Sequence, residues 1–207
     1  MDELDKGLGL NITVTGAARD AALEAFHRQL ADWGLAMPPV EPLVLDFGLG
    51  AFAETGLIEY WVANEAQAGY CGKFLFVFDG QTCPRHRHAL KHETFFVVKG
   101  RVRMQTGART FEMQAGDVLP VAPGHFHRFT GLGPALLLEL STPCQIADND
   151  FENPAIPINR SVEPEKGAGR SKSERERPGL GRNRLDRPAK CFQFTLLLRQ
   201  LALAFCH

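Results

Sequence analysis

Two histidines and a glutamate lie close together in the segment GQTCPRHRHALKHETFFVVKG, residues 80–100. His86 and His88 are separated by one residue, so in an extended strand their side chains point the same way, about 7 Å apart along the chain. Glu93 follows five residues later and begins a run of alternating apolar residues. Imidazole nitrogens with one carboxylate oxygen suit Mn, Fe, Co, Ni or Zn, without selecting among these metals.

A second histidine pair, in PVAPGHFHRF, offers a fourth ligand. The Pro123-Gly124 turn leads into a strand-like run in which His125 and His127 share one face. Only one of them can readily complete the site. The spacing Gly-x-x-His favours His127, with His125 as the alternative. A single His-x-His pair is common without a metal, but two such clusters with a glutamate and turn glycines predict a site for one divalent metal ion.

Short β-strands must position these residues. From about residue 43, runs rich in Val, Ile, Phe and Leu alternate with Gly, Pro, Asn or Asp, which is typical of an all-β sandwich or barrel. These runs are LVLDF, LIEYWV, KFLFVF, ETFFVV, RVRMQ, RTFEM, DVLPV, HFHRF and ALLLEL. The Lys99-Gly100 pair is expected to form a tight hairpin between two of the runs, and Ala115-Gly116-Asp117 is expected to form another turn.

An amphipathic helix is predicted before the strands, in RDAALEAFHRQLADWGL. Leu23, Phe26, Leu30 and Trp33 recur at three- and four-residue intervals and form one apolar face. We expect this face to pack against a sheet. Gly34 is a suitable end for the helix.

The chain divides by composition into an acidic body and a basic tail. Residues 161–207 hold ten of the 23 Lys and Arg but five of the 24 Asp and Glu, which leaves residues 1–160 with a net charge of −6. Residues 161–190 contain almost no large apolar residue and are expected to be disordered. We therefore predict three parts: an N-terminal helical segment (1–42), a barrel (43–160) and the basic tail (161–207).

The tail ends in CFQFTLLLRQLALAFCH, which is apolar but shorter than the roughly 20 residues of a membrane helix. It resembles read-through or a shifted reading frame, with a short docking helix as the alternative. The net charge of −1 argues against a nucleic-acid or membrane-surface partner. Five unpatterned cysteines and an N-terminus unlike a signal peptide favour a cytoplasmic protein with free thiols. Cys83 lies near the histidines, which already supply a complete ligand set.

The two histidine segments resemble the motifs of the cupin family. The first motif, Gly-x5-His-x-His-x4-Glu-x6-Gly, runs from Gly80 to Gly100. The second motif runs from Gly116 to His127 and matches more loosely, with Ala122 where the family usually has proline. The resemblance implies a double-stranded β-helix, or jelly-roll barrel, with the metal in its interior and the N-terminal helix packed on it.

Over roughly residues 20–160 the chain is also similar to the cupin-type D-lyxose isomerases. The similar segments include WGLAMPP, GYCGKFLFVF, LLLELSTP and ADNDFENPAI, and Lys91 within His-x-His-x-x-Lys-x-Glu is the position most typical of this family. The resemblance implies a metal-dependent, commonly manganese-dependent, isomerase that interconverts D-lyxose and D-xylulose, and often D-mannose and D-fructose. Such proteins are commonly homodimers.

Aldose–ketose isomerisation through a cis-enediol needs a Lewis acid and a base near C1 and C2. Glu139 is the candidate base, because it is the one ionisable residue in an apolar run; alternatively it faces solvent or orients a metal-binding histidine. Lys91 is the candidate for donating to a sugar oxygen or shuttling a proton, or else it is a surface lysine. Lys73 is a candidate for holding a substrate hydroxyl.

Other functions use the same ligands. An Fe(II) dioxygenase could have them, because fold and ligands do not fix the reaction, but Lys91 and the flanking segments argue against it. A non-catalytic sugar-binding cupin is the other alternative, although no helix-turn-helix module accompanies the barrel. A phosphosugar isomerase would need a cluster of basic side chains, which the strand segments lack.

Overall fold

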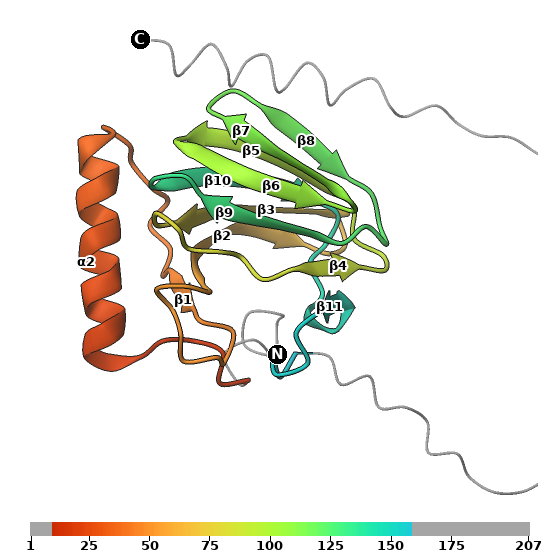
Figure 1. Cartoon of the computed structure of the whole chain (residues 1–207), viewed down its shortest axis with the longest axis horizontal. Coiled ribbons are helices and arrows are strands. Elements are labelled where there is room, and N and C mark those ends of the chain that lie inside the picture. Colours follow the sequence, from red (N-terminus) through yellow and green to blue (C-terminus); the bar gives the residue numbers. More distant parts are fainter. Residues whose placement is uncertain (1–9, 159–207) are drawn as a thin grey trace, which may run out of the picture. The chain divides into compact units, whose positions relative to one another are not determined.

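Two antiparallel β-sheets face each other, with a helix beside them, in the computed structural model, which describes residues 10–158 (Figure 1). Within this range one sheet has six strands in the order β1-β2-β3-β10-β5-β8, and the other has five in the order β11-β4-β9-β6-β7. The elements are α2 (Gly16–Asp32), β1 (Leu43–Leu45), β2 (Leu57–Glu65), β3 (Tyr70–Val77), β4 (His86–His88), β5 (Glu93–Lys99), β6 (Arg101–Thr106), β7 (Arg109–Gln114), β8 (Val118–Val121), β9 (His127–Gly131), β10 (Ala135–Ser141), the 3-10 turn η1 (Ile146–Asp148) and β11 (Asn149–Phe151).

The nine strand-like runs of the sequence all form strands, so the prediction of an all-β cupin barrel is confirmed. Alternation decides which side chains enter the barrel. In β6, for example, Val102 and Met104 are buried while Arg101 and Arg103 are exposed. The strand β11, which the sequence did not predict, pairs with β4 and completes the five-stranded sheet.

The predicted hairpin at Lys99-Gly100 is wrong. β5 pairs with β10 and β8, whereas β6 pairs with β7 and β9 in the other sheet. The chain therefore crosses between the sheets at Gly100, where φ is +77° and a Cβ atom would lie 2.1 Å from the carbonyl oxygen of Pro134. Glycine is required by this close approach and left-handed backbone, so it marks a crossover. The predicted turn at Ala115-Gly116-Asp117 is confirmed: it links β7 to β8.

The helix α2 packs its apolar face against the six-stranded sheet, as predicted (Figure 1). Phe26 and Leu30 are buried on this face, and Phe26 contacts the ring of Phe76 edge-on at 4.8 Å between centroids. Leu23 and Trp33 are partly buried beside them. Gly34 has φ of +65° and follows the last turn of the helix, which is the conformation that commonly ends a helix at glycine.

The interior of the barrel has a polar end and an apolar end. Neighbouring inward positions on paired strands show the change: Glu139 lies opposite Lys73, and Leu137, two residues away on β10, lies opposite Leu75. The apolar end is filled by side chains of both sheets, namely Val77, Val97, Val102, Met104, Phe129 and Leu137, all with at most 1% exposure. These residues form the packed core that holds the polar end in shape.

Three cysteines, Cys71, Cys83 and Cys144, are buried free thiols. Burial raises the pKa of Cys71 to about 11, against the opposing effect of Lys73. Among residues 10–158, no helix has the length and apolar character needed to cross a membrane. The predictions for residues 161–207 lie outside the described residues, and the division into 1–42, 43–160 and 161–207 stays a prediction.

Candidate functional site

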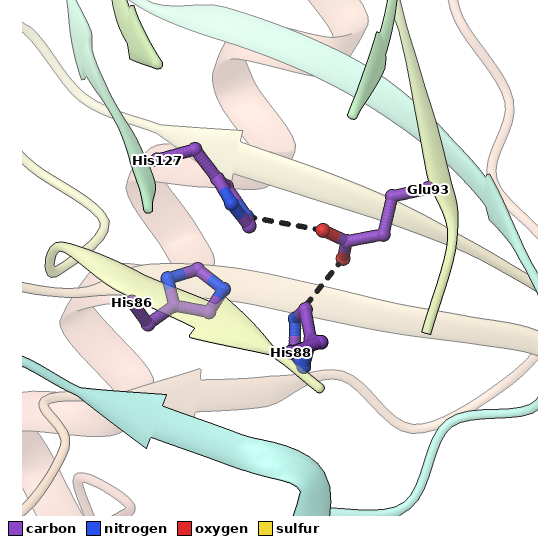
Figure 2. Close-up of side chains that lie close together, drawn as sticks. All are labelled: His86, His88, Glu93 and His127. Atoms are coloured by element: carbon purple, nitrogen blue, oxygen red, sulfur yellow. Dashed lines mark ion pairs between the residues drawn. The ribbon is translucent and has the colours of Figure 1, made fainter. Parts of the chain in front are cut away.

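Four side chains that can bind a metal converge at the polar end of the barrel: His86, His88, Glu93 and His127 (Figure 2). One possible ligand atom from each lies within 4.8 Å of all the others, and all four residues are buried. These are the four residues that the sequence predicted as ligands. His125 lies outside this cluster: it is exposed, and its ring contacts the backbone of Ala122 and Pro123.

The two sheets contribute different ligands. The three histidines come from the five-stranded sheet, where His86 on β4 pairs in register with His127 on β9. His88 lies two residues further along β4 and faces the same way. Glu93 begins β5 in the other sheet, between Val121 and Ser141. The cluster therefore forms only when the two sheets close on each other.

Each histidine of the cluster donates from Nδ1 to a backbone carbonyl. The acceptors are Pro84 for His86 at 2.8 Å, Asp148 for His88 at 3.1 Å and His125 for His127 at 3.0 Å. A proton held on Nδ1 leaves the Nε2 lone pair free, which is the usual arrangement of a metal-binding histidine. The backbone around the site thus fixes both the tautomer and the orientation of the rings.

The inward atoms lack the partners that a metal-free site would need. His88 Nε2 lies 3.3 Å from Glu93 Oε1, and His127 Nε2 lies 3.1 Å from Glu93 Oε2. None of these four atoms has a hydrogen bond with a described residue, although Glu93 Oε1 is within 2.7 Å of the Lys91 ammonium. With the proton on Nδ1, lone pairs face carboxylate oxygens, and such contacts are repulsive unless a cation lies between them.

The ionisation of the cluster suits a divalent cation. Burial, followed by the neighbouring His127 and His88, lowers the pKa of His86 well below its usual value, which favours a neutral ring. Burial would raise the pKa of Glu93, but the Lys91 ammonium outweighs it and holds the pKa well below its usual range. Neutral imidazoles and an ionised carboxylate are the forms that bind metal ions, so these residues fit a divalent metal.

A row of alternating charges leads away from the cluster, and we call it the charged row: Glu93, Lys91, Glu139, Lys73 and Glu59. Lys91 Nζ lies 2.7 Å from both Glu93 Oε1 and Glu139 Oε1. Lys73 Nζ lies 3.6 Å from Glu139 Oε2 and 3.1 Å from Glu59 Oε1. Every member is at most 7% exposed, so Glu139 and Lys91 lie inside the barrel, not at the surface.

The charges of the row support one another. Burial would lower the pKa of both Lys73 and Lys91, but their carboxylate neighbours, Glu139 foremost, raise it above the usual lysine value. Burial would raise the pKa of Glu139, but Lys73 and Lys91 outweigh it and lower the pKa. Buried ion pairs recover their desolvation cost only in part. A role in binding or catalysis therefore explains this row of buried charges better than a contribution to folding stability does.

Two residues of the site were missed in the sequence. Glu59 closes the far end of the charged row, and only its alternation with the buried Leu57 in the run LIEYWV could have indicated an inward side chain. Asp148 lies in η1, and its carboxylate accepts from the backbone N–H groups of Ala89, Leu90 and Lys91 at 2.9–3.1 Å. No local pattern marks Asp148, because its partners lie about 60 residues earlier in the chain.

Two adjoining pockets lie along the row and have four of its five members, all but Glu93, in their walls. The inner pocket is lined by His86, His88, Lys91, Cys83 and Glu139 together with apolar residues such as Phe95 and Phe129. The outer pocket is lined by Trp61 and Thr13 and by apolar residues such as Leu43 and Ile146. The two share five lining residues, which are Phe47, Glu59, Lys73, Asn149 and Phe151. The arrangement suits a small polar molecule with one end at the histidines.

Known proteins share this sequence and fold. Residues 75–141 match the Cupin domain family. The D-lyxose ketol-isomerase of Cohnella laeviribosi is 30% identical over an alignment of 171 positions, which covers 67% of this chain and 90% of that protein. The D-lyxose/D-mannose isomerase of Thermosediminibacter oceani is 29% identical over an alignment of 164 positions, which covers 64% of this chain and 90% of that protein.

The fold also occurs in solved structures of lower identity. The L-ribose isomerase of Cellulomonas parahominis, solved with L-ribose, has a TM-score of 0.60 at 16% identity and covers 71% of this chain and 96% of its own. The L-ribose isomerase of Acinetobacter sp. DL28 has a TM-score of 0.59 at 15% identity, covering 72% of this chain and 98% of its own. These likenesses concern the fold, whereas the sequence matches concern the family. The chain belongs to the D-lyxose isomerase family of cupin-fold aldose–ketose isomerases.

Proposed function

We propose that this chain interconverts D-lyxose and D-xylulose, and D-mannose and D-fructose, through a cis-enediol with one bound divalent metal. The observation that carries the proposal is the position of the charged row, which begins at the ligand cluster and places the Glu139 carboxylate one lysine away from Glu93. A metal site and a buried base inside one pocket are what this isomerisation requires. The choice of these sugars as substrates is supported by the relatives, which are named D-lyxose/D-mannose isomerase and D-lyxose ketol-isomerase.

His86, His88, Glu93 and His127 would hold the metal. When bound, a divalent metal supplies Lewis-acid polarisation of the carbonyl and hydroxyl oxygens of the sugar. The ligand types do not select among Mn, Fe, Co, Ni and Zn, and we propose manganese from the family resemblance. We likewise propose a homodimer in the cytoplasm.

Glu139 is proposed as the base. Its carboxylate would take the proton from C2 of the aldose and return it to C1 of the enediol, while a second proton moves from the C2 hydroxyl to O1. Its lowered pKa, caused by Lys73 and Lys91 against the effect of burial, keeps it ionised and ready to accept a proton. Ser141 Oγ donates to Glu139 Oε1 at 3.2 Å and orients the carboxylate.

The two lysines are proposed to position the sugar. The Lys91 ammonium lies between Glu93 and Glu139. From there it can donate to a sugar oxygen near the reacting carbons or help move the proton from the C2 hydroxyl to O1. The Lys73 ammonium lies between Glu139 and Glu59, where it can donate to a hydroxyl further along the chain. The wall of the inner pocket around them also includes apolar side chains such as Phe95 and Phe129.

The test is to incubate the full chain, loaded with manganese, with D-lyxose, D-mannose and D-fructose and to measure interconversion by chromatography. We expect D-xylulose from D-lyxose, and mutual conversion of D-mannose and D-fructose. The same protein after treatment with a chelator is the control and should be inactive. Oxygen consumption by the Fe(II)-loaded protein without any interconversion would instead support a dioxygenase, and sugar binding without turnover would support a sugar-binding cupin.

A further inference from the structure

We propose that Glu59, together with Lys73, forms a second sugar-binding site in the outer pocket, for the hydroxyl groups at C5 and beyond. The inference rests on the proposed isomerase function, because it assumes that C1 and C2 of the sugar lie at the histidine cluster. Its ligand class is the uncharged, polyhydroxylated end of an open-chain pentose or hexose. The site would make Glu59 a determinant of substrate length and charge.

The outer pocket adjoins the pocket that contains the histidines. The inner pocket, which contains His86 and His88, and the outer pocket share Glu59 and Lys73 in their walls. The charged row runs the same way: Glu59 is joined to Glu93 through Lys73, Glu139 and Lys91 by contacts of 2.7–3.6 Å. A sugar with its reacting end at the cluster and Glu139 therefore extends toward Glu59.

Glu59 has unused hydrogen-bonding capacity. The residue is 7% exposed, and Oε1 pairs with Lys73 Nζ at 3.1 Å. Oε2 makes no hydrogen bond or ion pair with any residue between 10 and 158. A carboxylate can accept about four hydrogen bonds, so the second oxygen is open to a hydroxyl donor. The ring of Trp61 lies beside the lysine of this pair, with its centroid 5.2 Å from Lys73 Nζ.

The wall of the outer pocket is chemically suited to an uncharged, hydroxylated ligand. Around Glu59 and Lys73 the outer pocket is lined mainly by apolar side chains such as Leu43, Phe47 and Phe151. A few polar groups set in an apolar wall fix the orientation of a small ligand. The row carries three carboxylates and two ammonium groups, and its outermost member is a carboxylate with a free oxygen. A hydroxyl can donate to that oxygen, whereas a phosphate would be repelled by it.

The experiment compares wild type and Glu59→Gln, both loaded with manganese, on a series of aldoses that share the configuration of D-lyxose at C2 and C3. The series is the corresponding aldotetrose, D-lyxose and D-mannose. For Glu59→Gln we expect KM to rise about tenfold or more for the pentose and hexose, because a hydrogen bond to a charged acceptor is lost, with kcat within about threefold. The tetrose ends before Glu59, so its KM and kcat should change less than about twofold.

An effect transmitted through Lys73 to Glu139 would lower kcat for all three sugars and would overturn the proposal. Unchanged KM for every sugar would overturn it too. The matched control is Glu54→Gln, an exposed glutamate outside both pockets, which should behave as wild type. Glu59→Asp keeps the charge on a shorter side chain and should restore part of the lost affinity. Bound manganese and the melting temperature are measured for each variant.

A binding measurement separates this proposal from the isomerase function. Alditols cannot isomerise, so calorimetry with the five-carbon alditol of D-lyxose and with the four-carbon alditol reports binding alone. Glu59→Gln should lower the affinity for the five-carbon alditol about tenfold and leave the affinity for the four-carbon alditol unchanged. If Glu59→Gln weakens binding of the five-carbon alditol in this way but wild type converts no aldose, the binding site stands and the isomerase function fails. Equal affinity of both proteins for the five-carbon alditol refutes the binding site.

Discussion

The polar and apolar ends of the barrel interior are built from the same strands but carry chemically different side chains. On β5 the inward residues change from Glu93 to Val97, and on β10 from Glu139 to Leu137, over the length of a few residues. Both ends are buried, with exposures of at most 3% at these four positions. The difference is chemical: one end holds charges and imidazoles, and the other holds apolar side chains.

This difference separates function from stability within one core. Apolar burial stabilises a fold by about 25 cal/mol per Å² of surface removed from water, which makes the apolar end the main source of folding free energy. Buried ion pairs, by contrast, often add little, because desolvation offsets their attraction. The charged row and the ligand cluster are therefore expected to matter for metal binding and turnover, and the apolar end for the free energy of unfolding.

The largest effect is expected from loss of a ligand. Replacing His88 or Glu93 by Ala should remove the bound metal and reduce turnover by about 10³-fold or more, because the metal contributes several kcal/mol to catalysis. Metal content by atomic spectroscopy and interconversion of D-lyxose measure the two effects. The control is His125→Ala, which changes an exposed histidine outside the cluster. This variant should keep both the bound metal and the turnover of wild type. Turnover retained at the wild-type level in either ligand variant would contradict the site.

A smaller loss, confined to the chemical step, is expected from Glu139→Gln. The variant should keep its metal, because Glu139 is not part of the cluster, while exchange of the C2 proton with solvent falls about 10²–10⁴-fold. Since the pKa of Glu139 is lowered, the wild-type carboxylate is ionised at neutral pH and should cause no loss of rate between pH 6 and 8. Exchange followed by NMR in D2O gives the measurement, and an unchanged exchange rate would exclude Glu139 as the base.

The apolar end should show the opposite response. Leu137 is completely buried, so Leu137→Ala should lower the free energy of unfolding by about 2–5 kcal/mol while metal content per folded protein stays at the wild-type level. Denaturant unfolding of the metal-free and metal-loaded protein tests this. A variant that unfolds as wild type but loses its metal would show that the two ends do not divide in this way.

The smallest effect is expected from Asp148, which acts through its neighbours. Its carboxylate holds the backbone of residues 89–91, and its carbonyl accepts from His88 Nδ1. Asp148→Ala should therefore weaken metal binding about 10–100-fold, as is typical when an outer partner of a ligand is lost. The matched control is Asp150→Ala on β11, whose carboxylate pairs with the half-exposed Arg87. Equal metal affinities in the two variants would remove the positioning role.

The sequence predicted the strands because alternation is local. Inward placement of Phe95, Val97 and Phe129 follows from the two-residue period that begins at Glu93 and His127, and the structure confirms their burial. The Lys99-Gly100 prediction failed because a glycine between two strands is compatible with either a hairpin or a crossover. The choice depends on the close approach of Pro134, a contact between residues far apart in the sequence.

The sequence by itself determined the types of residue at the site, the faces on which they lie and the family to which the chain belongs. Only the tertiary structure brought Glu59 and Lys73 to the same row as Lys91 and Glu139 and placed Asp148 against the segment before Glu93. The physical reason is that the two-residue period fixes the face of each side chain but not the strand that lies opposite. The partners of these buried charges are decided by the order of β2, β3, β10 and β5 in the six-stranded sheet.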